Sequence, residues 1–381
     1  MALNLKHLGS RLLLIIVSTF VGLATAEIAI RVWVAITLRS SASPLDDALG
    51  RSTEAVPDSD TETTDLRGLV RASASTDLVY ELKPELDCVF KGVRVRTNSH
   101  GMRNVECPRD KAEGVLRIAG LGDSVMFGWG VAEEETFLRL LEHRLTHAGF
   151  GGQEIEVLNF AVPGYNTAME VTALREKALD FSPDVVVLHF VNNDFDLPRF
   201  MIEGPDVWSL RRSWTVDLIR DGWRSLRASG EQWHEPRELE ILSPARRDRV
   251  RQRYAHLAGP EAFEAAMVSL EKMTRARSIA VVFVTMQTDG EPYAAAYRAA
   301  QRHGFHVVTV ASYFTDYVRD HQVQPNREGW ADTFWLSRRD PHPNQLGHRL
   351  FADAISHTVT PMIYARLSGE GGKAQGRPQP S

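Results

Sequence analysis

The sequence predicts an α/β protein whose main domain is a three-layer, doubly wound sheet of about five parallel strands. Two observations carry this prediction. Over residues 115–365, short apolar runs rich in β-branched residues alternate with segments of helical period, as in consecutive βαβ units. Each run is bounded by glycine, proline or polar residues, which is typical of strands that are buried on both faces.

Five apolar runs supply the predicted strands, and four segments supply the helices between them. The predicted strands are VLRIAGLG, IEVLNFAV, PDVVVLHFV, SIAVVFVTM and FHVVTVA. The predicted helices cover residues 136–148, 167–179, 260–275 and 292–303. Ligands of such sheets bind outside the carboxyl ends of the strands, near the point where the strand order reverses. We therefore expect the functional site at that edge.

Changes in composition divide the rest of the chain. Residues 40–65 are rich in Ser, Thr and Asp and lack an apolar period, which favours a flexible tether. Short alternating segments predict a small β region before the main domain. The predicted organisation is an N-terminal transmembrane anchor or uncleaved signal at 1–38, a flexible linker at 39–77, a small β region at 78–110, the main α/β domain at 111–368 with an insertion at 197–259, and a disordered tail at 369–381.

The N-terminal segment, residues 12–38, is apolar except for Glu27, Arg31 and a few small polar residues. At about 1.5 Å per residue, a helix of this length crosses a hydrocarbon core about 30 Å thick. Glu27 and Arg31 are four residues apart, so they share a helix face and neutralise each other. The sequence ATA at 24–26 leaves a cleaved signal peptide as the alternative, but residues 28–38 stay mostly apolar beyond it, which favours a retained anchor.

Charge and cysteine content argue against two classes of partner. With 44 Lys and Arg against 49 Asp and Glu, the net charge is −5, so nucleic acid is not an expected partner. The two cysteines, Cys88 and Cys107, are too few for a disulfide framework, and neither has the spacing of a zinc site. One bridge between them and two separate buried thiols both remain open.

A candidate nucleophile follows the first predicted strand, in Gly122-Asp123-Ser124. A serine on a sharp turn at a strand end exposes its hydroxyl and leaves backbone N–H groups free to bind an anion. Serine needs a base, and the candidate is His342 in the proline-braced loop RDPHPN. Asp340, two residues earlier, is placed to accept the Nδ1–H of the imidazole and to fix its tautomer. Without Ser124 at a strand end, this loop would read as a helix-start turn.

Donors for a developing oxyanion follow the next two predicted strands. Gly164 brings a backbone N–H close to a substrate without a Cβ in the way, and Asn193 in VNND supplies a side-chain amide. Turn chemistry explains each segment alone. It does not explain why a nucleophile, two donors and a base all fall at the carboxyl ends of strands.

The order Gly-Asp-Ser, Pro-Gly, Asn-Asp and Asp-x-His-Pro-Asn resembles the four motif blocks of the SGNH/GDSL hydrolase superfamily over residues 115–365. The resemblance implies a flavodoxin-like fold and no cofactor or metal. It also implies that Ser124 is the nucleophile and an oxyanion donor, Gly164 and Asn193 the other donors, and His342 with Asp340 the rest of a triad. Many relatives have the aspartate three positions before the histidine, whereas here the spacing is two.

The apolar N-terminus, the small β region and the segment TNSHGMR at 97–103 resemble bacterial membrane-anchored members. This resemblance implies a catalytic domain outside the cytoplasm, periplasmic or extracellular. The expected function is a serine-dependent ester hydrolase of the carboxylesterase or acetylesterase type, acting through an acyl-enzyme on a small-molecule or glycan acyl ester. The alternatives are an O-acyltransferase that modifies an envelope glycan and an inactive, membrane-tethered binding protein. The sequence does not indicate an oligomeric state.

Several other residues have a structural explanation. Asp123 is expected to tie the serine turn to neighbouring backbone, His189 to be a core histidine with its hydrogen bonds satisfied, and His348 to be a cap or packing residue. Four tryptophans in the insertion fit either a substrate pocket or helix packing. They are Trp208, Trp214, Trp223 and Trp233.

Overall fold

The computed structural model describes residues 5–40, 64–203, 215 and 232–368. The chain divides into two compact units. One comprises Met1–Val56 with Met201–Glu235, and the other Pro57–Phe200 with Pro236–Ser381. The predicted tail at 369–381, most of the predicted tether, and Trp208, Trp214 and Trp223 lie outside the described residues.

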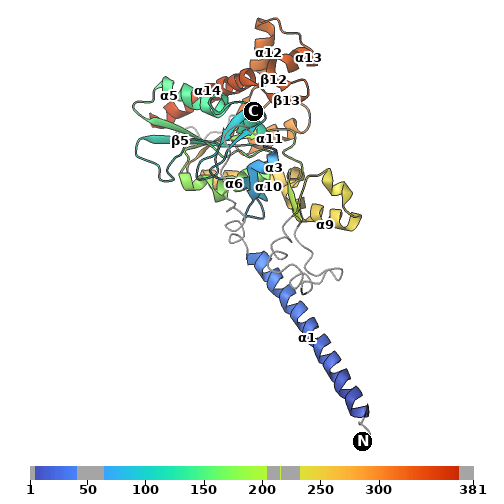
Figure 1. Cartoon of the computed structure of the whole chain (residues 1–381). Helices are drawn as coiled ribbons and strands as arrows, with labels where there is room; N and C mark the ends of the chain where they lie inside the picture. Colours follow the sequence, from blue (N-terminus) through green and yellow to red (C-terminus); the bar gives the residue numbers. More distant parts are fainter. Residues whose placement is uncertain (1–4, 41–63, 204–214, 216–231, 369–381) are drawn as a thin grey trace. The chain divides into compact units, whose positions relative to one another are not determined.

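The larger unit contains the predicted parallel sheet (Figure 1). Its five strands are β5 (Val115–Leu121), β6 (Glu154–Asn159), β7 (Val185–Phe190), β10 (Ala280–Thr285) and β11 (His306–Thr309). All neighbours run parallel, in the order β11-β10-β7-β5-β6. Strand β5 therefore lies between β6 and β7, at the point where the strand order reverses. The predicted fold class is confirmed.

Helices cover both faces of the sheet, which explains why its strands carry continuous apolar runs. Figure 1 shows α5 (Phe137–Ala148) and α14 (Gln345–Leu367) on one face, and α6 (Thr167–Glu176) and α10 (Gly259–Arg275) on the other. The predicted helix over 292–303 is observed as α11 (Tyr293–Arg302). Polar side chains begin three of these helices by accepting backbone N–H groups of the first turn. They are Thr136 before α5, Asn166 before α6 and Asn344 before α14.

Four short strands precede the sheet and form what we call the accessory β region, residues 64–107. Strands β1 (Val70–Ala72) and β2 (Tyr80–Leu82) pair antiparallel, as do β3 (Asp87–Phe90) and β4 (Val93–Arg96). Helix α3 (Leu66–Leu69) and β1 fall within the range predicted as linker. Leu69 and Val70 are buried there, and Val70 pairs with Leu82 of β2, which local composition does not reveal. Both cysteines are free thiols: Cys88 is half-buried and Cys107 is buried, and burial raises the pKa of Cys107 to about 11.

The predicted insertion at 197–259 contributes elements to both units. Strands β8 (Met201–Glu203) and β9 (Gln232–His234) pair antiparallel in the smaller unit. In the larger unit, the described part of the insertion ends in the arginine-rich helix α9 (Pro244–Tyr254).

The smaller unit contains α1 (Leu5–Ser40), a single continuous helix. Its stretch Leu14–Trp33 is long and apolar enough to cross a membrane, and a signal sequence would pass the same test. The predicted pair forms, with Arg31 2.6 Å from Glu27, and the other carboxylate oxygen of Glu27 accepts the backbone N–H and the hydroxyl of Thr215 at 2.8 Å. These contacts neutralise the two charges within a largely apolar helix.

Two neutral histidines are buried between the sheet and its α5–α14 face. His189 on β7 packs against Phe137 and Phe351, and Nδ1 of His348 on α14 accepts the backbone N–H of Phe137, the first residue of α5. Both are therefore packing residues. Burial lowers the pKa of each ring to about 3, and for His348 the positive charge of Arg103 adds to this shift.

Acidification should therefore destabilise the protein between about pH 6.5 and pH 3. In this window the unfolded chain binds protons on both imidazoles while the folded chain does not, so the stabilisation is complete above about pH 6.5 and is lost as the pH falls. Each ring contributes a slope of up to about 1.4 kcal/mol per pH unit. We expect His348→Asn, which keeps an acceptor for Phe137, to have a shallower dependence of unfolding free energy on pH than the wild type.

The matched control for this measurement is His321→Asn, because His321 is exposed. Denaturant unfolding of the detergent-solubilised chain at several pH values gives the slopes. The control should keep the wild-type slope. If His348→Asn also kept the wild-type slope, the imidazole of His348 would not be neutral in the folded protein over this pH range.

Candidate active site

Ser124 lies on a tight turn at the carboxyl end of β5, as the first residue of the short helix α4 (Ser124–Phe127). Asp123 caps this helix, and its Oδ1 accepts the Val125 N–H at 2.9 Å, which matches the structural role expected of it. Burial raises the pKa of the Asp123 carboxyl. A Cβ on Gly122 would lie 2.7 Å from Cβ of Met126, so the turn closes only with glycine at this position.

The structure brings Ser124, His342 and Asp340 into one hydrogen-bonded chain, although 218 positions separate the serine from the histidine. Nε2 of His342 lies 2.9 Å from Oγ of Ser124, and Nδ1 lies 2.6 Å from Oδ1 of Asp340. All three side chains are half-buried. Burial alone would raise the pKa of Asp340, but the hydrogen bonds from the side chain and backbone of His342 outweigh it, so this pKa lies below its ordinary value.

The two-residue spacing of Asp340 and His342 has a simple structural reason. Both belong to β13 (Asp340–Pro343), which pairs antiparallel with β12 (Trp335–Ser337). In an extended strand, residues two apart project to the same side, so the carboxylate and the imidazole meet directly. A spacing of two is therefore sufficient for this contact.

Gly164 and Asn193, the predicted oxyanion donors, lie in the loops that follow β6 and β7. These strands flank β5, so their carboxyl ends share one edge of the sheet with Ser124. Gly164 has a φ of +81°, and a Cβ there would lie 2.4 Å from Cβ of Arg199, so both conformation and space require glycine. Asn193 is half-buried in a turn in which its carbonyl accepts the Asp196 N–H at 2.9 Å.

Comparison with known families identifies the domain that carries these residues. Residues 121–350, more than half of the chain, match the model of the GDSL-like lipase/acylhydrolase family. The chain belongs to this family. The matched segment begins at the end of β5 and extends into α14, so it includes every site residue predicted above.

Solved structures of GDSL-type proteins and esterases resemble the chain at low sequence identity. A lipase/acylhydrolase from Enterococcus faecalis has 17% identity and a TM-score of 0.36, over 65% of this chain and 96% of its own. A G-D-S-L family lipolytic protein from Desulfitobacterium hafniense has 13% identity and a TM-score of 0.37, over 63% and 98%. An acetyl xylan esterase has 17% identity and a TM-score of 0.39, over 64% and 100%. No curated protein matches the sequence.

Arg103 supports the nucleophile turn of this GDSL domain, a role that the sequence did not reveal. Its side chain is 1% exposed, and its guanidinium donates to the carbonyls of Phe127, Gly128 and Val131 at 3.0, 2.6 and 2.7 Å. Burial lowers the pKa of Arg103 to about 10. The one available signal was the segment TNSHGMR, which ends at this arginine.

The accessory β region also contacts the loop that carries Gly164. The hydroxyl of Tyr80 donates to the carbonyl of Pro163 at 3.2 Å, and the hydroxyl of Tyr165 donates to the carbonyl of Tyr80 at 2.5 Å. Both tyrosines are buried. The accessory region therefore touches two of the three loops at the catalytic edge of the GDSL domain.

Two further acids are buried near the predicted oxyanion loop. Oδ2 of Asp194 accepts the hydroxyl of Thr167 at 2.7 Å, and neither carboxylate oxygen of Glu170 has a hydrogen-bond partner. Burial raises the pKa of both carboxyls well above their ordinary values, and the negative charge of Asp123 adds to both shifts, as the charge of Asp194 adds to the shift of Glu170. Among the described residues, these and other acids form no cluster suited to a metal ion.

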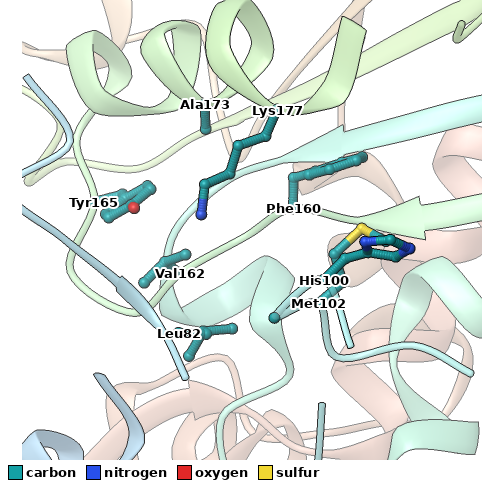
Figure 2. A pocket seen from close by; sticks show the side chains of 9 residues that line it. Leu82, His100, Met102, Phe160, Val162, Tyr165, Ala173 and Lys177 are labelled. Carbon is teal, nitrogen blue, oxygen red and sulfur yellow. The ribbon is translucent and has the colours of Figure 1, made fainter. Parts of the chain in front are cut away.

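A small cavity lies between the accessory region and α6 (Figure 2). Its lining includes His100 and Met102 from the accessory region, and Phe160, Val162 and Lys177 from the rest of the larger unit. Lys177 is ion-paired with Glu81. The cavity volume is about 10 Å³, which is about the space of one water molecule. It is therefore too small to hold an acyl group.

Proposed function

We propose that this protein is a serine-dependent hydrolase of acyl esters, with Ser124 as nucleophile, His342 as base and Asp340 as the group that orients the base. The observation that carries the proposal is the hydrogen-bonded chain from Asp340 through His342 to Ser124, with contacts of 2.6 and 2.9 Å. Membership of the GDSL-like lipase/acylhydrolase family supports ester hydrolysis independently of this geometry.

The proposed reaction has two steps. Oγ of Ser124 attacks the ester carbonyl while Nε2 of His342 takes its proton, and the imidazolium then protonates the departing alcohol to leave an acyl-enzyme. Water attacks the acyl-enzyme by the same route in reverse and releases the acid. The backbone N–H groups of Ser124 and Gly164 and the side-chain amide of Asn193 are the proposed donors to each tetrahedral oxyanion. The ionised Asp340 stabilises the imidazolium, which agrees with the lowered pKa of its carboxyl.

The proposed substrate is a small-molecule or glycan acyl ester outside the cytoplasm. We propose that α1 holds the enzyme at a membrane, because Leu14–Trp33 has the length and composition of a span. Its apolar side chains are open to their surroundings: Leu14 is 68% exposed and Phe20 is 74% exposed. Such a surface is unfavourable in water and favourable in lipid.

A fluorophosphonate probe should label the wild-type chain at Ser124. The probe forms a stable bond only with a serine hydroxyl whose proton a base can accept, so an inert scaffold with this fold would not react. Intact mass and peptide mapping of the detergent-solubilised chain check the site. Ser124→Ala should abolish labelling, His342→Gln should slow it by orders of magnitude, and unchanged labelling of Ser124→Ala would reject the assignment.

A further inference from the structure

Trp129 contacts both members of the Asp340–His342 pair. It follows α4 and is half-buried. Its indole lies against the imidazole of His342, with ring centroids 4.7 Å apart and planes inclined by 13°. Its Nε1–H donates to Oδ2 of Asp340 at 3.2 Å. One side chain thus restrains the plane of the imidazole and also binds the carboxylate oxygen that the imidazole leaves free.

The Asp340 carboxylate needs such a partner because its own strand does little to orient it. Strand β13 is four residues long and belongs to a two-stranded hairpin rather than to the central sheet. Oδ1 of Asp340 accepts both the backbone N–H and the Nδ1–H of His342. Without the bond from Trp129 to Oδ2, the carboxylate could rotate about its terminal torsion, which is broad in aspartate. The indole N–H opposes this rotation.

Trp129 is itself held from the accessory β region. The ring of Phe90, 1% exposed, meets the indole edge-to-face with centroids 4.7 Å apart, and Nζ of Lys91 lies 5.1 Å from the indole centroid. Arg103 binds the carbonyls of Gly128 and Val131 on either side of Trp129. These contacts hold the indole from residues outside the hairpin that carries Asp340 and His342.

We infer that Trp129 is a positioning residue of the reaction, which aligns the Asp340–His342 pair with Ser124 and is braced by Phe90, Lys91 and Arg103. The inference rests on the serine mechanism proposed above. It gives the accessory β region a role in catalysis, since that region supplies all three bracing side chains. Trp129 has no assigned contact with substrate, so its loss acts on turnover and not on substrate affinity.

The test compares Trp129→Phe and Trp129→Leu with the wild-type chain, in detergent, on a short p-nitrophenyl ester. Phenylalanine keeps an aromatic face for His342 but removes the donor to Asp340, and we expect kcat to fall about tenfold with KM changed less than about twofold. Leucine removes both contacts, and we expect a fall of about a hundredfold. Trp330→Phe is the matched control, because Trp330 packs against Phe314 and Phe334.

The pH profile separates positioning from packing. Without the indole donor, Asp340 becomes a stronger acceptor for His342 and favours the imidazolium, so the acid limb of kcat/KM should move to higher pH in Trp129→Phe. Trp330→Phe should keep the wild-type limb and rate. A tryptophan that only packs would lower thermal stability without moving the limb.

Wild-type kcat and an unmoved acid limb in Trp129→Phe would overturn the inference. Trp129→Phe tests the positioning role of Trp129 even if Trp129→Leu fails to fold. Ser124→Ala, measured in parallel, distinguishes a failure of the positioning role of Trp129 from a failure of the serine mechanism. If Ser124→Ala is inactive while Trp129→Phe is unimpaired, only the role of Trp129 fails; if Ser124→Ala keeps its activity, the serine mechanism fails first.

Discussion

Ser124→Ala should reduce kcat on a short p-nitrophenyl ester by at least about 10⁴-fold. The methyl group of alanine cannot form the acyl-enzyme. In the described structure, no other nucleophilic side chain is hydrogen-bonded to Nε2 of His342 and could replace the serine. The fold should survive, because in the described part of the chain the hydroxyl of Ser124 is hydrogen-bonded only to Asp123 and His342. Steady-state kinetics together with the thermal unfolding midpoint check both statements.

Ser356→Ala is the matched control for this loss. Ser356 lies on α14, and its hydroxyl donates to the carbonyl of Asp353 within the same helix. The control should keep wild-type kcat and KM. Substantial turnover by well-folded Ser124→Ala would show that the serine is not the nucleophile, whatever the distance between Ser124 and His342.

The second large effect is expected from Asp340→Asn, which should lower kcat by about 10²- to 10⁴-fold. The amide that replaces the carboxylate can donate to Nδ1 of His342, which places the ring proton on Nε2, where it faces Ser124. An imidazole in that tautomer cannot take the serine proton. The loss should shrink at alkaline pH, where hydroxide can serve as the base, and a pH–rate profile measures this.

Asp332→Asn is the control for that substitution. Asp332 is exposed and precedes the hairpin, it is ion-paired with Arg338 in the hairpin turn, and in the described structure it forms no ion pair with His342. Its rate should stay close to that of the wild type. Equal rates for wild type and Asp340→Asn would mean that a different group orients His342.

The spacing of Asp340 and His342 illustrates what a motif leaves undecided. The sequence resembled its family in every block, yet the aspartate stood one position closer to the histidine than in many relatives. Whether a spacing of two lets a carboxylate contact an imidazole depends on the backbone conformation. A strand places residues i and i+2 on the same side, whereas a helical turn does not. Here β13 is extended, so a spacing of two is sufficient for Asp340 to contact His342.

The side chains that hold the predicted site residues in place could not be predicted from the sequence. Arg103 and Tyr80 act through backbone carbonyl oxygens, which any sequence supplies, and Trp129 acts through its ring face and an N–H directed at Asp340, so no residue pattern announces their partners. The linker predicted over 39–77 likewise overlooked α3 and β1. Both elements lie beyond the Ser- and Thr-rich stretch 40–65, and β1 forms by pairing with β2, a contact that composition does not reveal.

The sequence by itself determined the doubly wound sheet, the order of its strands along the chain and the residues able to act as nucleophile and base. It did so because burial on both faces imposes apolar runs, and because turns at strand ends require glycine and short polar side chains. Only the tertiary structure decided which strand lies at the centre, that His342 lies 2.9 Å from Ser124, and that one indole contacts both His342 and Asp340. Such contacts join residues more than 200 positions apart, and their geometry depends on the packing of the whole domain.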